Sequence, residues 1–539
     1  MPNPCSVPVA PPCAPPLSDP RLLDFFARRF NSATVQALTP IPPHTDNGDE
    51  ALYADKCGTY TKCIRQASPG KVDLAAYATF LHALSTGLFS DFEAIQLGGT
   101  RTLNGPMAAY AYTFMGSDCS QFGNALSPAN QEFASPVVPP APALDSEAYA
   151  TELVELYWCS LLRDVAFSEY SRNPIAIEAA EELSVLPSYA GPTENGTVTP
   201  RLLFRGTFPD ETIGPYLSQF LVTPTVLGAQ PISQKCITYR RDLDYMTDLA
   251  TWQDVQNGIA TGLANQTDPT PRYLHNGRGL AAYTHVDVLY QEYFTAYLVL
   301  SSINAPVNPG NPYVGSKTQN GFGTFGAPDF ASVLAQVSKI ALNAVWYQKW
   351  LVHLRHRPES GGGLVHLIKS GVGFDGSPHD NVLNSSAVDR SYRKYGTWLL
   401  SQAFPEGSPA HPAYPTGHGA VGGACITILK FFFDGTYALP NPQMPSNDGT
   451  RLEPWNGSEE GGPAAALTVN GELNKLGHNV TFAHGLHPGI HWRSDSNISL
   501  LLGEAVAISF LRDLACTYTE PFTVQFTKFD GSTATISNI

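Results

Sequence analysis

The stretch His411–His418 carries residues that could bind and protonate an anion. Thr416 stands where the N-cap of a helix would stand, and Pro415 prevents any helix from continuing into this point from upstream. The first amides of a helix have no partners within it, so they can donate to an anion, and Gly417 lets that anion approach the backbone. His418 follows as a candidate acid–base group. Taken alone, these residues more often indicate a capped helix with a surface histidine, because such short motifs are weak.

Two other segments carry residues that would complete an anion site. Lys349, His353 and Arg357 are spaced four residues apart, which predicts that they lie along one face of a helix. Such a row of cations is usually a solvated face, and it gains a function only where a second anion-binding element meets it. His491 and Asp495 are also four residues apart. A carboxylate one turn away can hold one ring nitrogen of a histidine and leave the other free for a ligand.

Three helical patterns must position these residues. Apolar residues recur at helical spacing over Phe330–Ala344, over Gly419–Phe432 and over Ile498–Leu511. Pro358 is expected to end the first pattern, and Gly361–Gly363 reads as a turn after it.

In this order, the three segments resemble the vanadium-dependent haloperoxidases, whose superfamily also holds the type 2 phosphatidic acid phosphatases. The pattern of a lysine, Arg-Pro, a Pro-Ser-Gly-His-like motif and a later histidine with an aspartate is matched here. The resemblance is widest to the algal bromoperoxidase branch. It includes Phe204–Gly206, Gly214–Gln219, Tyr245–Asp248, Glu406–Pro409, Gly471–Leu476 and Leu502–Glu504.

The resemblance implies vanadate as the cofactor. His491 would bind the vanadium through a ring nitrogen, and the oxygens of the vanadate would be held by Lys349, Arg357, the hydroxyl of Thr416 and the amide of Gly417. Fixed cations and amides must offset the negative charge of vanadate, and that offset makes bound peroxide more electrophilic. Phosphate, which has a similar shape and charge, could take the place of vanadate.

The resemblance also implies roles for the residues around the cofactor. His418 would bond to an oxygen of the vanadate and transfer protons, and Lys349 would polarise bound peroxide. His411 matches a histidine of the bromide- and iodide-oxidising members, and Trp346 matches a tryptophan near the halide in brown-algal members. Asp495 would support His491. The implied reaction converts bromide or iodide and hydrogen peroxide to hypohalous acid, which halogenates a small organic acceptor.

One position departs from the family pattern. An arginine is expected six residues before the axial histidine, but that position is Gly485. His484 aligns with the arginine if one residue is added before His491, and His487 and Arg493 are other candidate substitutes. Loss of one charge-assisted contact could weaken binding of an oxyanion by about 1.5–3 kcal/mol, roughly ten- to a hundredfold.

The resemblance implies an all-α fold in which two four-helix bundles form the core of one large domain. We predict a proline-rich arm over residues 1–30, a helical domain over residues 31–539 and an active-site half over about residues 328–519. Alternating residues around Asp530–Gly531 predict a small C-terminal β-hairpin. Algal members of the family form dimers or larger shells, so a homo-oligomer is expected.

The composition narrows the range of partners. The net charge is −15 and charged residues make up 15% of the chain, so nucleic acids and anionic membranes are unfavourable partners. No run of apolar residues is long enough to span a membrane. Residues 1–20 show no signal peptide, whereas the family resemblance suggests a secreted or cell-wall protein.

Two alternatives to a haloperoxidase remain at this point. An acid phosphatase could use the same constellation, with His491 as the nucleophile and His418 as the acid. A catalytically impaired member could keep the fold without the arginine that Gly485 replaces.

Overall fold

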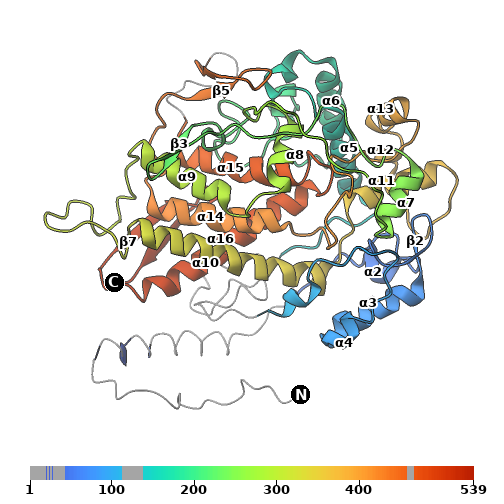
Figure 1. The fold of residues 1–539 in the computed structure, drawn as a ribbon, viewed down its shortest axis with the longest axis horizontal. Coiled ribbons are helices and arrows are strands. Elements are labelled where there is room, and N and C mark those ends of the chain that lie inside the picture. Colours follow the sequence, from blue (N-terminus) through green and yellow to red (C-terminus); the bar gives the residue numbers. More distant parts are fainter. Residues whose placement is uncertain (1–19, 21–22, 25–26, 28–42, 112–137, 458–466) are drawn as a thin grey trace.

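The structure, a computed structural model, describes residues 43–111, 138–457 and 467–539, together with residues 20, 23, 24 and 27. Most of the arm predicted for residues 1–30 therefore lies outside the described residues. The described chain is mostly helical and otherwise contains small two-stranded antiparallel sheets (Figure 1). This confirms the predicted helical class.

The first half of the described chain consists mainly of short helices and small sheets. A group of short elements lies near residues 49–110: α2 (Asp49–Leu52), β1 (Gln66–Ser68), β2 (Lys71–Val72), α3 (Leu74–Thr86), α4 (Phe89–Phe92) and η1 (Pro106–Tyr110). The elements that follow are α5 (Glu147–Leu161), η4 (Phe167–Arg172), α6 (Pro174–Ser184), η5 (Pro200–Leu202), η6 (Gln219–Leu221), β3 (Thr225–Leu227), β4 (Gln230–Ile232), α7 (Leu249–Gln256), α8 (Gly277–His285) and α9 (Gln291–Ser302).

The second half contains the longest helices. Its elements are α10 (Ala327–Tyr347), η7 (Gln348–His353), α11 (Pro358–Lys369), α12 (Asp380–Leu383), α13 (Ser386–Tyr395), α14 (Gly417–Phe432), β5 (Gln443–Pro445), β6 (Leu452–Pro454), α15 (Val469–His484), α16 (Arg493–Ala515), β7 (Thr523–Thr527) and β8 (Thr533–Ser537). The C-terminal hairpin β7–β8 pairs Thr523 with Ser537, as the alternating pattern predicts.

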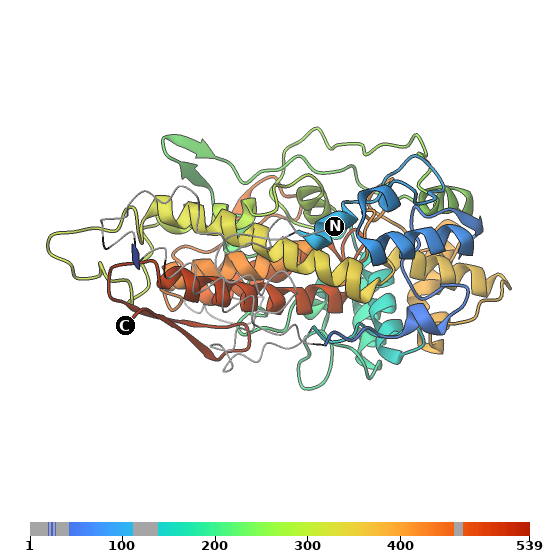
Figure 2. The ribbon, with the colours of Figure 1, turned by 90° about the horizontal axis from the view of Figure 1, so that it is seen from below.

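The central helix of the molecule is α14, every residue of which is buried. It packs against α10, α15 and α16, and α10, α14 and α16 run side by side (Figures 1 and 2). A helix that is apolar on all sides must be covered on all sides, which is why neighbouring helices enclose it. The described part of the chain has no helix long and apolar enough to cross a membrane.

Glycines bring the backbones of α14 and α16 into direct contact. A Cβ atom added at Gly423 would lie 2.0 Å from the carbonyl oxygen of Leu500, and one added at Gly503 would lie 2.0 Å from that of Ala420. Neither position has room for a methyl group. The two helices therefore pack at a separation that larger residues would prevent.

The segment that carries the cations is not one continuous helix, so the prediction that Lys349, His353 and Arg357 share a helical face was wrong. The α-helix ends at Tyr347 and η7, a π-helix, follows as far as His353. Leu354 then adopts a left-handed conformation with φ of 45°, and Arg357 is extended at the N-cap of α11. The helical spacing of the two residues therefore does not predict how Arg357 is placed relative to Lys349.

The glycines expected to form a turn lie inside α11 instead. A Cβ atom at Gly362 would lie 2.5 Å from that of Leu400, and one at Gly363 would lie 2.0 Å from the ring of Trp252. Close packing against other segments outweighs the low helix propensity of these residues.

Candidate active site

The candidate site lies where three chain segments meet. Lys349 comes from η7 and Arg357 from the start of α11, while Thr416, Gly417 and His418 form the first turn of α14. The third segment is the loop that ends at His491, just before α16. These residues are all buried, and the structure brings together every residue predicted to hold the anion.

His491 is held by a carboxylate on one side and faces a guanidinium on the other. Its Nδ1 lies 2.8 Å from Oδ2 of Asp495, which also accepts from the amide of Trp492. Since Asp495 is an acceptor, the proton of His491 is on Nδ1, and Nε2 carries the lone pair. Nη1 of Arg357 donates to that Nε2 over 2.7 Å. Burial, followed by the charge of Arg357, lowers the pKa of His491 well below its usual value, which keeps the ring neutral.

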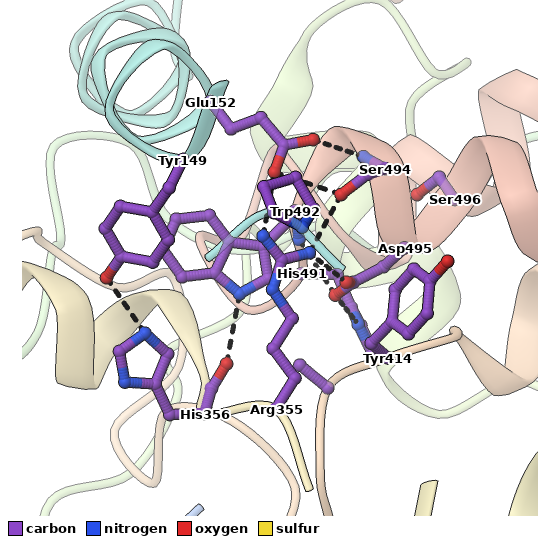
Figure 3. A network of polar contacts seen from close by, with 12 residues as sticks. Tyr149, Glu152, Arg355, His356, Tyr414, His491, Trp492, Ser494, Asp495 and Ser496 are labelled. Carbon is purple, nitrogen blue, oxygen red and sulfur yellow. Dashed lines mark hydrogen bonds and ion pairs between the residues drawn. The ribbon is translucent and has the colours of Figure 1, made fainter. Parts of the chain in front are cut away.

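Arg355, which sequence reasoning missed, fixes Asp495 (Figure 3). Its guanidinium donates to Oδ1 of Asp495 over 2.7 Å and to Oε2 of Glu152 over 2.9 Å. The ring of Trp492 lies below it at 4.6 Å, and Glu152 also accepts from the amide of Ser494. The result is a buried chain of charges that runs from α5 to His491. Nothing in the sequence around Arg355 distinguishes its role from that of Arg357, which lies two residues later.

Two buried cations in the site have no carboxylate partner. Nζ of Lys349 donates to the carbonyls of Pro412 and Ala413, each over 2.8 Å. Arg357 donates to carbonyls and to histidine rings, including Nδ1 of His411 over 2.9 Å. Within the described chain, neither cation forms an ion pair with a carboxylate. Buried charges without counterions are unfavourable, so this arrangement favours a bound anion.

The pKa values show that the positive charges of the two cations are costly in this buried site. Burial, followed by the charge of Arg357, lowers the pKa of Lys349 well below its usual value, and burial lowers the pKa of Arg357 to about 10. The amide of Thr416 donates to the carbonyl of Asp495 over 3.2 Å, and its hydroxyl is fully buried and has no hydrogen-bond partner among the described residues. An oxyanion at this point would both offset the two charges and accept from the hydroxyl.

His418 is bonded to a carboxylate that sequence reasoning did not identify. Its Nε2 lies 2.9 Å from Oδ2 of Asp287, in the loop before α9. The two residues are 131 positions apart, and a single aspartate in a loop carries no pattern that predicts this contact. The ring of His418 also stacks on His484, with ring centroids 3.6 Å apart and an interplanar angle of 19°.

The three candidate substitutes for the missing arginine have different surroundings. His484 stacks on His418, and its ring centroid lies 5.5 Å from that of His491. Its buried Nδ1 has no hydrogen-bond partner in the part of the chain that the structure describes. Arg493 donates instead to both carboxylate oxygens of Glu155.

His487 is also turned away, because it lies against Cys159 and Tyr216. Because Arg493 and His487 are bonded to these other groups, the structure gives no support for either of them in the place of the arginine. A side chain at Gly485 would force a shift of its neighbours, since a Cβ atom there would lie 2.8 Å from the carbonyl oxygen of Thr481 and 3.0 Å from Cβ of His491.

Trp346 and His411 form one wall of the site. Their rings lie 4.8 Å apart at 44°, and Nε1 of Trp346 donates to the carbonyl of Gly105. Burial, followed by the charge of Arg357, lowers the pKa of His411 well below its usual value. The wall therefore presents an aromatic ring and a neutral histidine beside the cations.

Comparisons with known proteins identify relatives of this chain, although no family model matches it. It is 32% identical over 510 residues to a vanadium-dependent bromoperoxidase of Ascophyllum nodosum. The aligned region covers 90% of this chain and 87% of that protein. It is 30% identical over 590 residues to a vanadium-dependent bromoperoxidase of Corallina officinalis, covering 95% and 98% respectively. Among solved structures, the homohexameric second vanadate-dependent bromoperoxidase of Ascophyllum nodosum matches with a TM-score of 0.88 and 27% identity, over 99% of this chain and 94% of that one.

Proposed function

The chain belongs to the vanadium-dependent bromoperoxidases, and we propose that it uses vanadate and hydrogen peroxide to oxidise bromide or iodide to hypohalous acid. The observation that carries this proposal is the pair of buried cations, Lys349 and Arg357, without a carboxylate partner in the described structure. Arg357 also contacts Nε2 of the neutral His491, and the hydroxyl of Thr416 has no hydrogen-bond partner among the described residues. This donor set fits a small, highly charged oxyanion.

The residues proposed to hold vanadate each offer a suitable atom. Nε2 of His491 would bind the vanadium, while Lys349, Arg357, Thr416 and the amide of Gly417 would hold its oxygens. The chemistry that bound vanadate supplies is the activation of peroxide toward halide, without a change in the oxidation state of vanadium. Phosphate shares the charge and shape of vanadate, so we expect it to compete for the same donors.

His418 is the proposed acid–base residue. It lies in the first turn of α14, and Asp287 holds its Nε2, so Nδ1 is the nitrogen available for proton exchange with the oxyanion or its substrate. Lys349 would polarise bound peroxide. His411 and Trp346 form the wall on which we expect halide preference to depend.

We propose that His484 takes the place of the missing arginine. Its unpartnered Nδ1 and its stacking on His418 support this role. Burial, followed by the charge of His418, lowers the pKa of His484, so it brings a neutral donor where other members bring a permanent charge. Its hydrogen bond to the oxyanion should be weaker than that of an arginine but should still contribute to binding.

Replacing His484 with alanine should weaken vanadate binding about tenfold, because one hydrogen bond to a charged group is lost. Calorimetric titration of the vanadate-free protein would measure the change, with His82→Ala as a control at a histidine whose side chain is 65% exposed. Equal affinity in both variants would show that His484 does not contact the anion.

The function itself is tested by stripping the protein of metal and then adding vanadate. Bromide- and peroxide-dependent bromination of a coloured acceptor should appear only after vanadate is added, and the melting temperature should rise with it. Hydrolysis of a phosphate ester without any bromination would instead favour the acid phosphatase. Loss of both activities would favour an impaired member. Neither alternative is favoured by the relatives, which are named bromoperoxidases.

We also infer the finer architecture from the family. The packing of α10, α14, α15 and α16 supports one four-helix bundle in an active-site half over about residues 328–519, within one domain over residues 31–539. The second bundle is an expectation from the resemblance. The homohexameric relative supports self-association of this chain, which a monomeric mass in light scattering would contradict.

A further inference from the structure

Trp346 is an oxidisable side chain at the edge of the candidate site. Its ring centroid lies 4.8 Å from that of His411, and Arg357 donates to Nδ1 of the same histidine over 2.9 Å. Cζ3 of the indole lies 3.4 Å from a Cβ atom built at Gly417, the residue whose amide is proposed to hold the oxyanion. The indole is therefore no more than one side chain away from two of the proposed anion donors.

The indole of Trp346 is open to small molecules, unlike most tryptophans of the chain. It is only partly buried, and the hydrogen bond from its Nε1 to the carbonyl of Gly105 is exposed to solvent. The chain has seven tryptophans, and five of them are at most 5% exposed, so they are shielded from reagents. These five are Trp158, Trp252, Trp350, Trp455 and Trp492.

Trp398 is the other partly buried tryptophan, and it lies away from the candidate site. Its ring stacks on that of Tyr392, with centroids 4.3 Å apart, and also lies against Lys369 and His366. None of these neighbours is a residue of the candidate site. Trp346 and Trp398 thus form a matched pair, with the same chemistry and partial burial but different positions.

Hypobromous acid, the product of the proposed reaction, oxidises indole rings. Its bromine bonds to Cγ while its hydroxide takes up a proton to form water. A water molecule then adds at Cδ1, and bromide leaves Cγ with its electron pair. The net reaction converts the indole and hypobromous acid to an oxindole, bromide and a proton. Bromine gains the two electrons that the indole loses, and the oxygen atom added to the side chain comes from water.

We propose that Trp346 is a modification site, at which hypobromous acid formed in the candidate site is captured before it escapes. The inference rests on the proposed function, because that reaction supplies the oxidant. A group that lies where a reactant is formed meets it at a higher effective concentration than a group in contact only with the bulk solution. Trp398 meets only the acid that has left the site, so Trp346 is oxidised first.

The test follows the peptides that contain Trp346 and Trp398 by mass spectrometry while the vanadate-loaded protein consumes bromide and hydrogen peroxide. In water labelled with heavy oxygen, hypobromous acid should add one labelled oxygen atom to the indole. Direct oxidation by peroxide would add an unlabelled atom and would not require bromide. We expect Trp346 to be oxidised about tenfold faster than Trp398, because of the higher effective concentration at Trp346.

Two further arms separate capture in the site from attack by the bulk solution. Excess organic acceptor consumes hypobromous acid in solution, so it should protect Trp398 but not Trp346. Hypobromite added as a reagent to the vanadate-free protein reaches both tryptophans from solution, so the preference for Trp346 should disappear. Trp346→Phe should remove the label from its peptide. Trp398→Phe, the control outside the site, should leave the oxidation of Trp346 unchanged.

The outcomes distinguish this inference from the proposed function. A wild-type protein that does not brominate would overturn the function and, with it, the source of the oxidant. Bromination with Trp346 unmodified, or oxidised no faster than Trp398, would overturn the inference alone. Protection of both tryptophans by the acceptor would do the same. Failure of reagent hypobromite to oxidise Trp346 would show that the indole is closed to the acid, whatever the activity.

Discussion

Replacing His491 with alanine is expected to abolish both vanadate binding and bromide oxidation. Its Nε2 is the proposed vanadium ligand, and Asp495 already fixes the proton on Nδ1. Loss of a residue that merely supports a metal ligand typically costs about 10- to 100-fold in affinity or activity, so loss of the ligand itself should cost more. Titration of the stripped protein with vanadate and the bromination assay would measure both effects.

Addition of imidazole provides the control for this variant. The space left by the ring lies beside Arg357, which donates to Nε2 in the wild type, so free imidazole should enter it and restore part of the binding. The contacts of Asp495 with Arg355 remain, and the fold should survive. Full activity of His491→Ala without imidazole would rule out His491 as the ligand.

The second large effect concerns stability. Arg355→Ala should lower the free energy of unfolding by about 3–5 kcal/mol, because Asp495 and Glu152 would both remain buried without their shared cation. Urea denaturation of the vanadate-free protein would measure the loss. The variant should also bind vanadate poorly, since Asp495 would no longer be held against His491.

Arg390→Ala is the matched control for Arg355→Ala. Arg390 pairs with Glu178 at the surface, where the two side chains are 34% and 31% exposed, so its loss should cost less than about 1 kcal/mol. Similar losses for the two variants would show that the buried chain of charges contributes nothing special to stability.

Part of the candidate site could be predicted from the sequence because Thr416–His418 and His491–Asp495 are short local patterns. The helix expected over Gly419–Phe432 is present as α14, which begins two residues earlier at Gly417. His491 and Asp495 meet as their spacing predicts, since His491 lies just before α16 and Asp495 lies in the first turn of that helix. Local spacing reports contacts within a turn or two of a helix, and these contacts are of that kind.

The rest of the site could not be predicted because it depends on packing between distant segments. Asp287 and Glu152 reach the site from loops and helices far away in the sequence, and no periodicity links them to it. The break after Tyr347 has no proline or glycine to signal it. Likewise, the glycines of α11 lie in a helix because neighbouring segments pack too closely for larger side chains, and this packing outweighs their low helix propensity.

The glycine contact between α14 and α16 has a consequence for the energetics of turnover. His418 lies in the first turn of α14, and His491 lies just before α16. The two backbones that touch at Gly423 and Gly503 therefore carry the proposed acid–base residue and the proposed vanadium ligand. Two backbones without intervening side chains can neither slide nor separate without losing that contact. The distance between the two histidines is therefore set during folding, and each catalytic cycle proceeds with little reorganisation energy.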